Sequence, residues 1–143
     1  MKKIIGIFLL IMSATFYTNA QEVTYKDIKF KHKKGFVVVN KKNVLKLKYS
    51  AGYFYIYDLN SNDELMYFHI NDNETFHYMD DDYVKVFFTN SEKILESKSH
   101  HRVVMAQLIN EKVFDSEWNI DEDKIDKFIK KYDENISNRT IRN

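Results

Sequence analysis

The 143-residue sequence predicts an α+β fold, an antiparallel β-meander of about six strands followed by two C-terminal helices packed on the sheet. In the first part of the chain, short runs of alternating apolar and polar residues are separated by clusters of Asn, Asp, Ser and Gly, which is typical of strands and turns. No gap between these runs is long enough for a crossover helix, so neighbouring strands should be antiparallel. After residue 98 the apolar residues recur at helical spacing instead. We expect one domain over residues 21–143, with a β-rich part (21–98), a helical part (99–137) and a tail (138–143).

The strands follow from the alternation. From Tyr25 to Lys33, the residues Ile28, Phe30 and His32 fall on one side of a predicted strand, and lysines fall on the other. Further strands are expected at FVVV (36–39), VLKLKY (44–49), YFYIYD (53–58), ELMYFHI (64–70), TFHYM (75–79) and YVKVFF (83–88).

Two helices are expected after the sheet. Ser99 is placed to cap a short helix over residues 100–111, with Val104, Leu108 and Met105 facing inward. Asp121 is a good N-cap for the second helix, since its carboxylate can accept from the free backbone N–H groups there. Glu122 and Asp123 then lie at the positive end of the helix, which favours negative charge. The apolar stripe of this helix consists of Ile125, Phe128, Ile129, Tyr132 and Ile136.

The first twenty residues have the pattern of a cleaved signal peptide. Lys2 and Lys3 precede a short apolar stretch, and Thr18 and Ala20 are the small residues that a signal peptidase reads. The apolar stretch is shorter than the roughly 20 residues of a membrane-spanning helix. We therefore expect cleavage after Ala20, export to the periplasm or outside the cell, and no transmembrane segment in the mature chain.

Composition and charge narrow the possibilities further. The chain has no cysteine, so neither a disulfide nor a thiolate nucleophile is available. Residues 21–48 carry nine lysines and two acids, whereas residues 49–92 carry one lysine and nine acids. Such segments can neutralise one another as neighbouring strands, or present opposed faces to partners.

The stretch YFYIYDLNSNDELMYFHI (53–70) contains D-x-N-x-N, which is how an EF-type calcium loop begins. Such a loop also needs Gly at position 6 and Glu at position 12, where this chain has Asp63 and His69. The flanking runs alternate as strands do, so we interpret the stretch as a hairpin with a turn. If Asp58 faces Glu64, the pairs are Tyr57 with Leu65, Tyr55 with Tyr67, and Tyr53 with His69.

One side of this hairpin is a candidate ligand-binding face. A tyrosine has an apolar ring and a polar tip, which suits sugar faces, peptides or amphiphilic ligands. The alternative is that the two helices cover this face, and we expect covering because the amphipathic C-terminal helix must bury its apolar stripe. The face consists of Tyr53, Tyr55, Tyr57, Tyr67 and His69.

The hairpin and the C-terminus also carry a resemblance. The strand YFYIYDLN (53–60), the run ELMY (64–67) and the segment EDKIDKFIKKYDENI (122–136) are similar to those of a group of small exported proteins of unknown function in Bacteroidota-type bacteria. The resemblance spans residues 53–70 and about 100–137. It implies export and a small α+β domain, and it implies no activity.

A second candidate site is the basic strip KDIKFKHKKG (26–35). Its lysines could bind an anionic partner such as lipopolysaccharide or an acidic glycan. They are equally typical of a solvated strand face, and lysines on an edge strand prevent edge-to-edge aggregation. Nucleic acid is not expected, because residues 21–101 lack arginine and export separates the chain from cytoplasmic nucleic acid. The candidate residues are Lys29, Lys31, Lys33 and Lys34.

Metal and enzyme signatures are scarce. The histidines show no H-E-x-x-H spacing, and we expect the neighbours His100 and His101 to point different ways, so no metal site is predicted. The run Asp80-Asp81-Asp82 is interpreted as an acidic turn. The mature chain has two glycines, too few for a phosphate-binding or dinucleotide-binding loop, and no cofactor is expected. The five histidines are His32, His69, His77, His100 and His101.

The leading hypothesis is an exported, non-enzymatic binding or interaction domain, whose partner is a protein or an envelope glycan or lipid. A small hydrolase that uses a pair of carboxylates stays open as an alternative, because the separation of acids in space cannot be inferred from sequence. A component of envelope assembly is a further alternative, and an exposed apolar patch or strand edge would be its sign.

Overall fold

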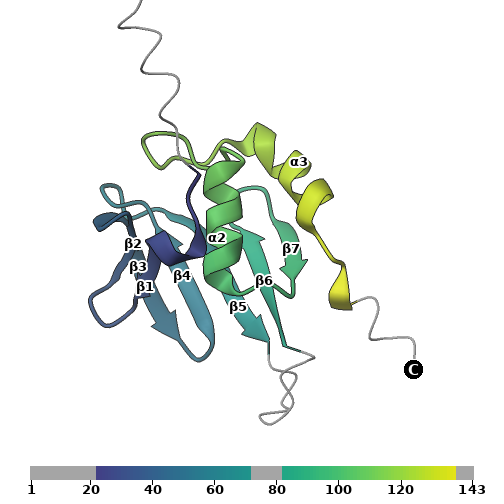
Figure 1. Cartoon of the computed structure of the whole chain (residues 1–143), viewed down its shortest axis with the longest axis horizontal. Helices are drawn as coiled ribbons and strands as arrows, with labels where there is room; N and C mark the ends of the chain where they lie inside the picture. The colour runs from purple at the N-terminus through teal and green to yellow at the C-terminus, as the bar shows by residue number, and fades with distance from the viewer. Residues whose placement is uncertain (1–21, 72–81, 138–143) are drawn as a thin grey trace, which may run out of the picture.

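The computed structural model describes residues 22–71 and 82–137, which form a seven-stranded antiparallel sheet and two helices (Figure 1). Each strand pairs with the next one along the chain, so the order in the sheet is the order in the sequence. The predicted α+β meander is confirmed, with seven strands rather than about six. The strands are β1 (Ile28–Lys31), β2 (Phe36–Val39), β3 (Lys42–Ser50), β4 (Tyr53–Tyr57), β5 (Glu64–Asn71), β6 (Tyr83–Phe88) and β7 (Lys93–Ser97).

Two differences from the predicted strands stand out. The expected strand at 75–79 lies outside the described residues. So do the signal peptide, His77, Asp80-Asp81 and the tail 138–143. Strand β7 is not predicted, because its sequence KILES has only two adjacent apolar residues, too few to show alternation. In the structure Leu95 is buried and Ile94 is 45% exposed, so the alternation exists and is short.

The hairpin of β4 and β5 is close to the predicted one. Tyr53 pairs with His69 and Tyr55 pairs with Tyr67, as expected. Tyr57 pairs with Glu64 instead of Leu65, because the register shifts between Ile56 and Tyr57 and leaves Leu65 as an extra residue.

The loop of this hairpin is an Asx-type turn. The Asp58 carboxylate accepts hydrogen bonds from the backbone N–H groups of Asn60 and Ser61, both at 2.9 Å. These bonds lower the pKa of the carboxyl. Asp58 therefore serves to close the turn, as the sequence indicates.

The two helices form where the apolar spacing places them. Helix α2 (His101–Asn110) buries Val104, Met105, Ala106 and Leu108, and it begins one residue later than expected. Its N-cap is His100 rather than Ser99, since the His100 ring nitrogen accepts from the backbone N–H of Arg102. Helix α3 (Glu122–Tyr132) has the predicted N-cap, Asp121, which accepts from the N–H of Asp123. It buries Ile125 and Phe128 and ends before Ile136, which is buried beyond the helix.

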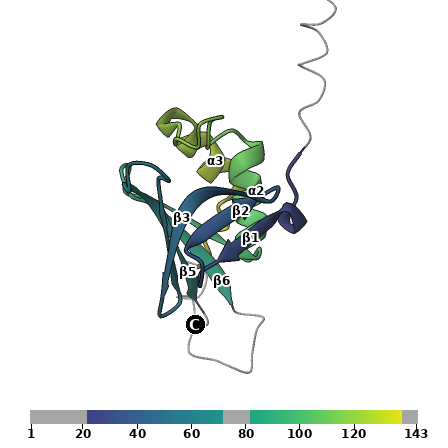
Figure 2. The same cartoon turned by 90° about the vertical axis from the view of Figure 1, so that its left-hand side faces the viewer.

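Both helices lie on one side of the sheet (Figure 2). The sheet bends so that β1 and the short 3-10 turn before it (Tyr25–Asp27) contact α2, while α3 lies beside β7. The apolar side chains of this concave side form a single core with the helices, and Phe68, Phe88, Met66 and Ile56 are almost wholly inaccessible to solvent. The ring of His101 in α2 packs 5.0 Å from that of Phe54 in β4, which fixes this side of β4 as the helix side.

The segment after α3 runs along the outer edge of β7. The backbone N–H of Glu134 donates to the carbonyl oxygen of Glu96 at 2.9 Å, and the Asp133 carboxylate accepts from the N–H of Glu96. The buried Glu96 side chain accepts from both the N–H and the hydroxyl of Ser137. The chain's own C-terminal segment therefore already pairs with this edge of the sheet at Glu96.

Candidate functional site

The candidate site is a set of aromatic side chains on the convex side of the sheet, opposite the helices. In β4, Phe54 and Ile56 point into the core, so the alternate residues Tyr53, Tyr55 and Tyr57 point the other way. In β5 the same alternation places Tyr67 and His69 on this convex side. The expectation that the helices cover this face is wrong, because both described helices pack against the opposite side.

The aromatic rings contact one another across three strands. The ring of Tyr53 stacks on that of His69 with centroids 4.2 Å apart and an interplanar angle of 8°. Tyr67 lies 5.6 Å from Tyr55 and stacks on Phe87 of β6 at 4.5 Å. All five of these residues are half-buried, so each ring has one part packed and another part accessible to solvent. We call these five residues together with Tyr57 the aromatic face.

Cross-strand registers explain why these rings meet. Residues directly opposite each other in antiparallel strands have Cβ atoms about 5 Å apart, close enough for rings to touch. Tyr53 and His69 are such a pair, and Tyr67 and Phe87 are another. Phe87 is the member that the sequence reasoning missed, although the alternation of buried Val84, Val86 and Phe88 in β6 would have placed it on this side.

Burial and a nearby carboxylate change the pKa of two tyrosines of the aromatic face. Partial burial raises the pKa of the Tyr57 and Tyr67 hydroxyls, and the nearby Glu64 carboxylate raises both further. Glu64 accepts a hydrogen bond from the Thr89 hydroxyl at 2.9 Å, at the loop end of the hairpin. Tyr57 and Tyr67 are therefore neutral at physiological pH, able to donate and accept hydrogen bonds through their hydroxyls.

Lysines of β3 lie directly beside this face. Lys46 pairs with Tyr57, and Lys48 pairs with Tyr55. Lys85 lies within the face on β6, where it pairs with His69 on one side and with Glu96 of β7 on the other, and its ammonium lies 5.9 Å from the centre of the Tyr83 ring. The aromatic face thus has cationic side chains along its β3 side, which the sequence reasoning did not identify because it treated the lysines and the tyrosines as separate sites.

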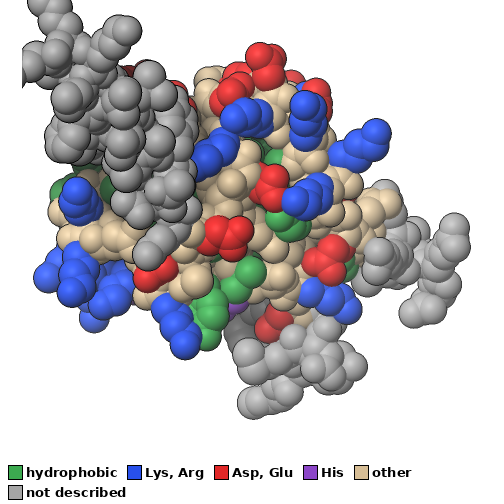
Figure 3. All heavy atoms as spheres, turned by 45° about the horizontal axis from the view of Figure 1, so that its top comes forward, with side chains coloured by type: hydrophobic (Ala, Val, Ile, Leu, Met, Phe, Trp, Pro, Cys, Tyr) green, Lys and Arg blue, Asp and Glu red, His purple; other side chains and the backbone are tan. Residues whose placement is uncertain are grey.

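The basic strip divides into two parts. Lys29 and Lys31 of β1 alternate with Ile28 and Phe30, so they lie on the convex side of the sheet. The other two candidate lysines, Lys33 and Lys34, are exposed in the turn between β1 and β2. Figure 3 shows lysines gathered on the left of the molecule, where β1 to β3 lie in Figure 1, whereas acids and lysines are mixed over α3.

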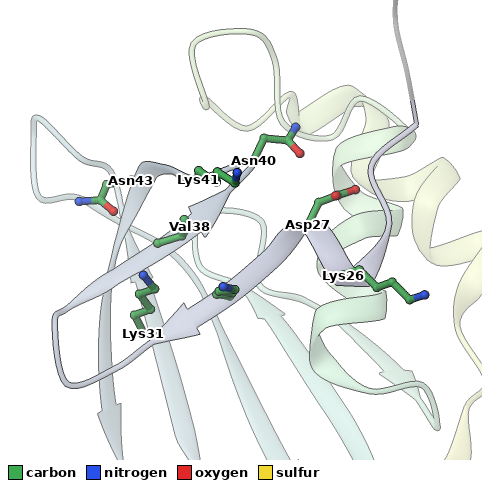
Figure 4. A pocket seen from close by; sticks show the side chains of 8 residues that line it. Lys26, Asp27, Lys31, Val38, Asn40, Lys41 and Asn43 are labelled. Atoms are coloured by element: carbon green, nitrogen blue, oxygen red, sulfur yellow. The ribbon is translucent and has the colours of Figure 1, made fainter.

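A hollow of about 380 Å³ lies at the β1–β3 end of the sheet (Figure 4). Val38 of β2 is buried in it, and Lys31 and Asn43 project from the neighbouring strands. Asn40 and Lys41 form the tight turn between β2 and β3, both with positive φ, as a two-residue hairpin turn requires. The full lining consists of Lys26, Asp27, Lys29, Lys31, Val38, Asn40, Lys41 and Asn43.

The described histidines and acids form no metal site. Within residues 22–71 and 82–137, no group of three His, Asp or Glu side chains is placed to hold an ion. The rings of His100 and His101 contact each other at 4.0 Å, so the expectation that they diverge is wrong. The reason is that His100 has extended backbone as the N-cap and does not lie on the helix. In the same part of the chain, Glu96 is the one buried acid, and Ser137 occupies both of its oxygens.

Comparisons of the chain with protein-family models, with curated proteins and with solved structures give no match. None of the helices in the described ranges has the length and apolar character needed to cross a membrane.

Proposed function

We propose that this protein is an exported, non-enzymatic binding domain that holds an extended carbohydrate against its aromatic face. The observation that supports this most directly is the contiguous row of half-buried rings on the side of the sheet opposite both described helices. Export rests on the signal-peptide pattern of residues 1–20.

The chemistry of the face suits sugar rings. The less polar face of a sugar ring packs well on an aromatic ring, and the hydroxyl groups at its rim need hydrogen-bond partners. Tyrosine supplies both, which distinguishes this face from the aliphatic and phenylalanine side chains of the core. The face extends over β4, β5 and β6, so a chain of several sugars has more than one ring to contact.

A tyrosine on each side of the sheet allows a matched test. Tyr55→Ala removes a ring from the aromatic face, whereas Tyr49→Ala removes a ring that is 46% exposed on the helix side, beside Phe54. Each protein is titrated by calorimetry with cellohexaose, chitohexaose and a galacturonate hexamer. Trp118 reports folding, because it lies in the connection between α2 and α3 next to Phe114.

Saturable binding of a hexasaccharide that Tyr55→Ala abolishes and Tyr49→Ala retains supports the proposal. Absence of binding to all three hexasaccharides at millimolar concentration would refute it. Equal loss in the two variants would refute it as well, because binding would then not depend on the convex side.

A further inference from the structure

The lysines and tyrosines that the sequence presents as separate segments share one surface in the structure. Lys29 and Lys31 of β1 and Lys48 of β3 point to the same convex side as the aromatic face. The pairing of Lys48 with Tyr55 puts an ammonium group within reach of whatever lies on that ring.

None of these three lysines is in an ion pair within the part of the chain that the structure describes. Its ion pairs there join Lys93 to Asp126, Lys124 to Asp121 and Lys131 to Glu111, all of them involving helix α3 or its N-cap. Lys46 donates instead to the side-chain oxygen of Asn62. Lys48 therefore presents positive charge beside the half-buried ring of Tyr55, and Lys29 and Lys31 add to it at the β1 end of the same side, whereas the charge of Lys46 also acts on the Asp58 carboxyl.

The hollow at the β1–β3 end continues this surface. It has four lysines and one aspartate in its lining, together with two asparagine amides, and it lies on the far side of β3 from the aromatic face. Strands are spaced about 4.8 Å apart, so β4 and β1 are separated by about 14 Å across the sheet. A linear ligand can therefore contact the rings with one part and the lysines of the hollow with another.

We propose that the ligand is an acidic polysaccharide, whose sugar rings pack on the aromatic face and whose carboxylate or phosphate groups pair with Lys48 and with the lysines of the hollow. This inference rests on the proposed carbohydrate-binding function. Charge complementarity selects the acidic class, because a neutral glycan would leave the lysines beside Tyr55 and in the hollow without partners. A nucleic acid fits less well, since this surface has no arginine and the described Arg102 lies on α2.

The test compares two ligands that share one sugar backbone, of which one is charged and the other is neutral. The galacturonate hexamer and its fully methyl-esterified form share one backbone, and calorimetric titrations are run at 20 and 200 mM NaCl. Lys48→Gln removes one cation from the surface, and Lys127→Gln, exposed on α3, is the control for net charge. An oligo-dT of equal charge tests for a nucleic acid.

The acidic hexamer should bind at least fivefold more tightly than the ester at 20 mM NaCl, and the difference should shrink at 200 mM as salt screens the charges. Lys48→Gln should weaken binding of the acidic hexamer about threefold, as expected for one exposed charge pair, and leave binding of the ester unchanged. Lys127→Gln should bind both hexamers as wild type does.

Three outcomes would overturn the inference. The first is equal affinity for acid and ester, and the second is an equal effect of Lys48→Gln and Lys127→Gln. The third is tighter binding of oligo-dT than of the acidic hexamer. If Tyr55→Ala abolishes binding while Lys48→Gln has no effect, the carbohydrate-binding function is supported and the preference for acidic ligands is refuted. If Tyr55→Ala binds as wild type does, both proposals are refuted.

Discussion

The imidazole of His101 should make the stability of the fold depend on pH. Its ring lies 4.7 Å from that of Phe30 and 5.0 Å from that of Phe54, between α2 and the sheet. Burial, with smaller contributions from His100 and Arg102, lowers the pKa of His101 from 6.5 to about 3. The folded chain thus keeps this ring neutral down to about pH 3, whereas the unfolded chain takes up a proton near pH 6.5.

The direction of the effect follows from proton binding. Between pH 6.5 and about pH 3 the unfolded state binds the extra proton, so the free energy of unfolding falls as the pH falls. At pH 5 the full effect would be about 2 kcal/mol, from 1.36 kcal/mol per pH unit. The ring retains some solvent contact, which reduces the expected effect to about 1 kcal/mol.

The assay is urea denaturation followed by Trp118 fluorescence at pH 7.5 and pH 5.0. His101→Phe keeps an aromatic ring between Phe30 and Phe54 and cannot be protonated. Wild type should therefore lose about 1 kcal/mol more stability than His101→Phe between the two pH values. His32→Phe, at an exposed position in the turn after β1, should behave as wild type does. Identical pH dependence in wild type and His101→Phe would refute the argument.

Two further substitutions test the core and a helix end, each by urea denaturation at pH 7.5. Phe68→Ala removes a fully buried ring and should cost about 3–5 kcal/mol, so a loss below about 1.5 kcal/mol would contradict the packing described. Asp121→Ala removes the cap of α3 and should lower the free energy of unfolding by about 1 kcal/mol. Asp121→Asn can still accept the hydrogen bond from Asp123 and should keep most of the stability. Equal losses in the two variants would mean that the negative charge at the helix start matters more than this hydrogen bond.

Local pairing could be predicted from the sequence because it depends on neighbouring residues. The alternation along 53–70 gives the pairs Tyr53 with His69 and Tyr55 with Tyr67, and the spacing of Ile125 and Phe128 gives helix α3. The bulge at Leu65 could not be predicted, since one extra residue leaves the pattern of apolar residues almost unchanged.

The side of the sheet chosen by the helices could not be read from alternation, which shows only that two faces exist. Physical chemistry accounts for the choice. Covering the tyrosines would bury several hydroxyl groups that need hydrogen-bond partners, at a cost for each one left unpaired. Covering Phe54, Ile56, Met66 and Phe68 carries no such cost. The link between Lys48 and Tyr55 was missed for a similar reason, because it depends on the β3–β4 register.

The C-terminal segment that pairs with β7 has a consequence for self-association. Growth of a fibre by strand addition requires two open sheet edges on each molecule, because each molecule must pair with one neighbour on either side. At one end of this sheet, Asp133 and Glu134 already occupy the backbone groups of Glu96. At the other end, β1 pairs with β2 alone among the described residues. Two copies that meet edge to edge would join β1 to β1 and leave no edge for a third, so this mode of assembly ends at a dimer.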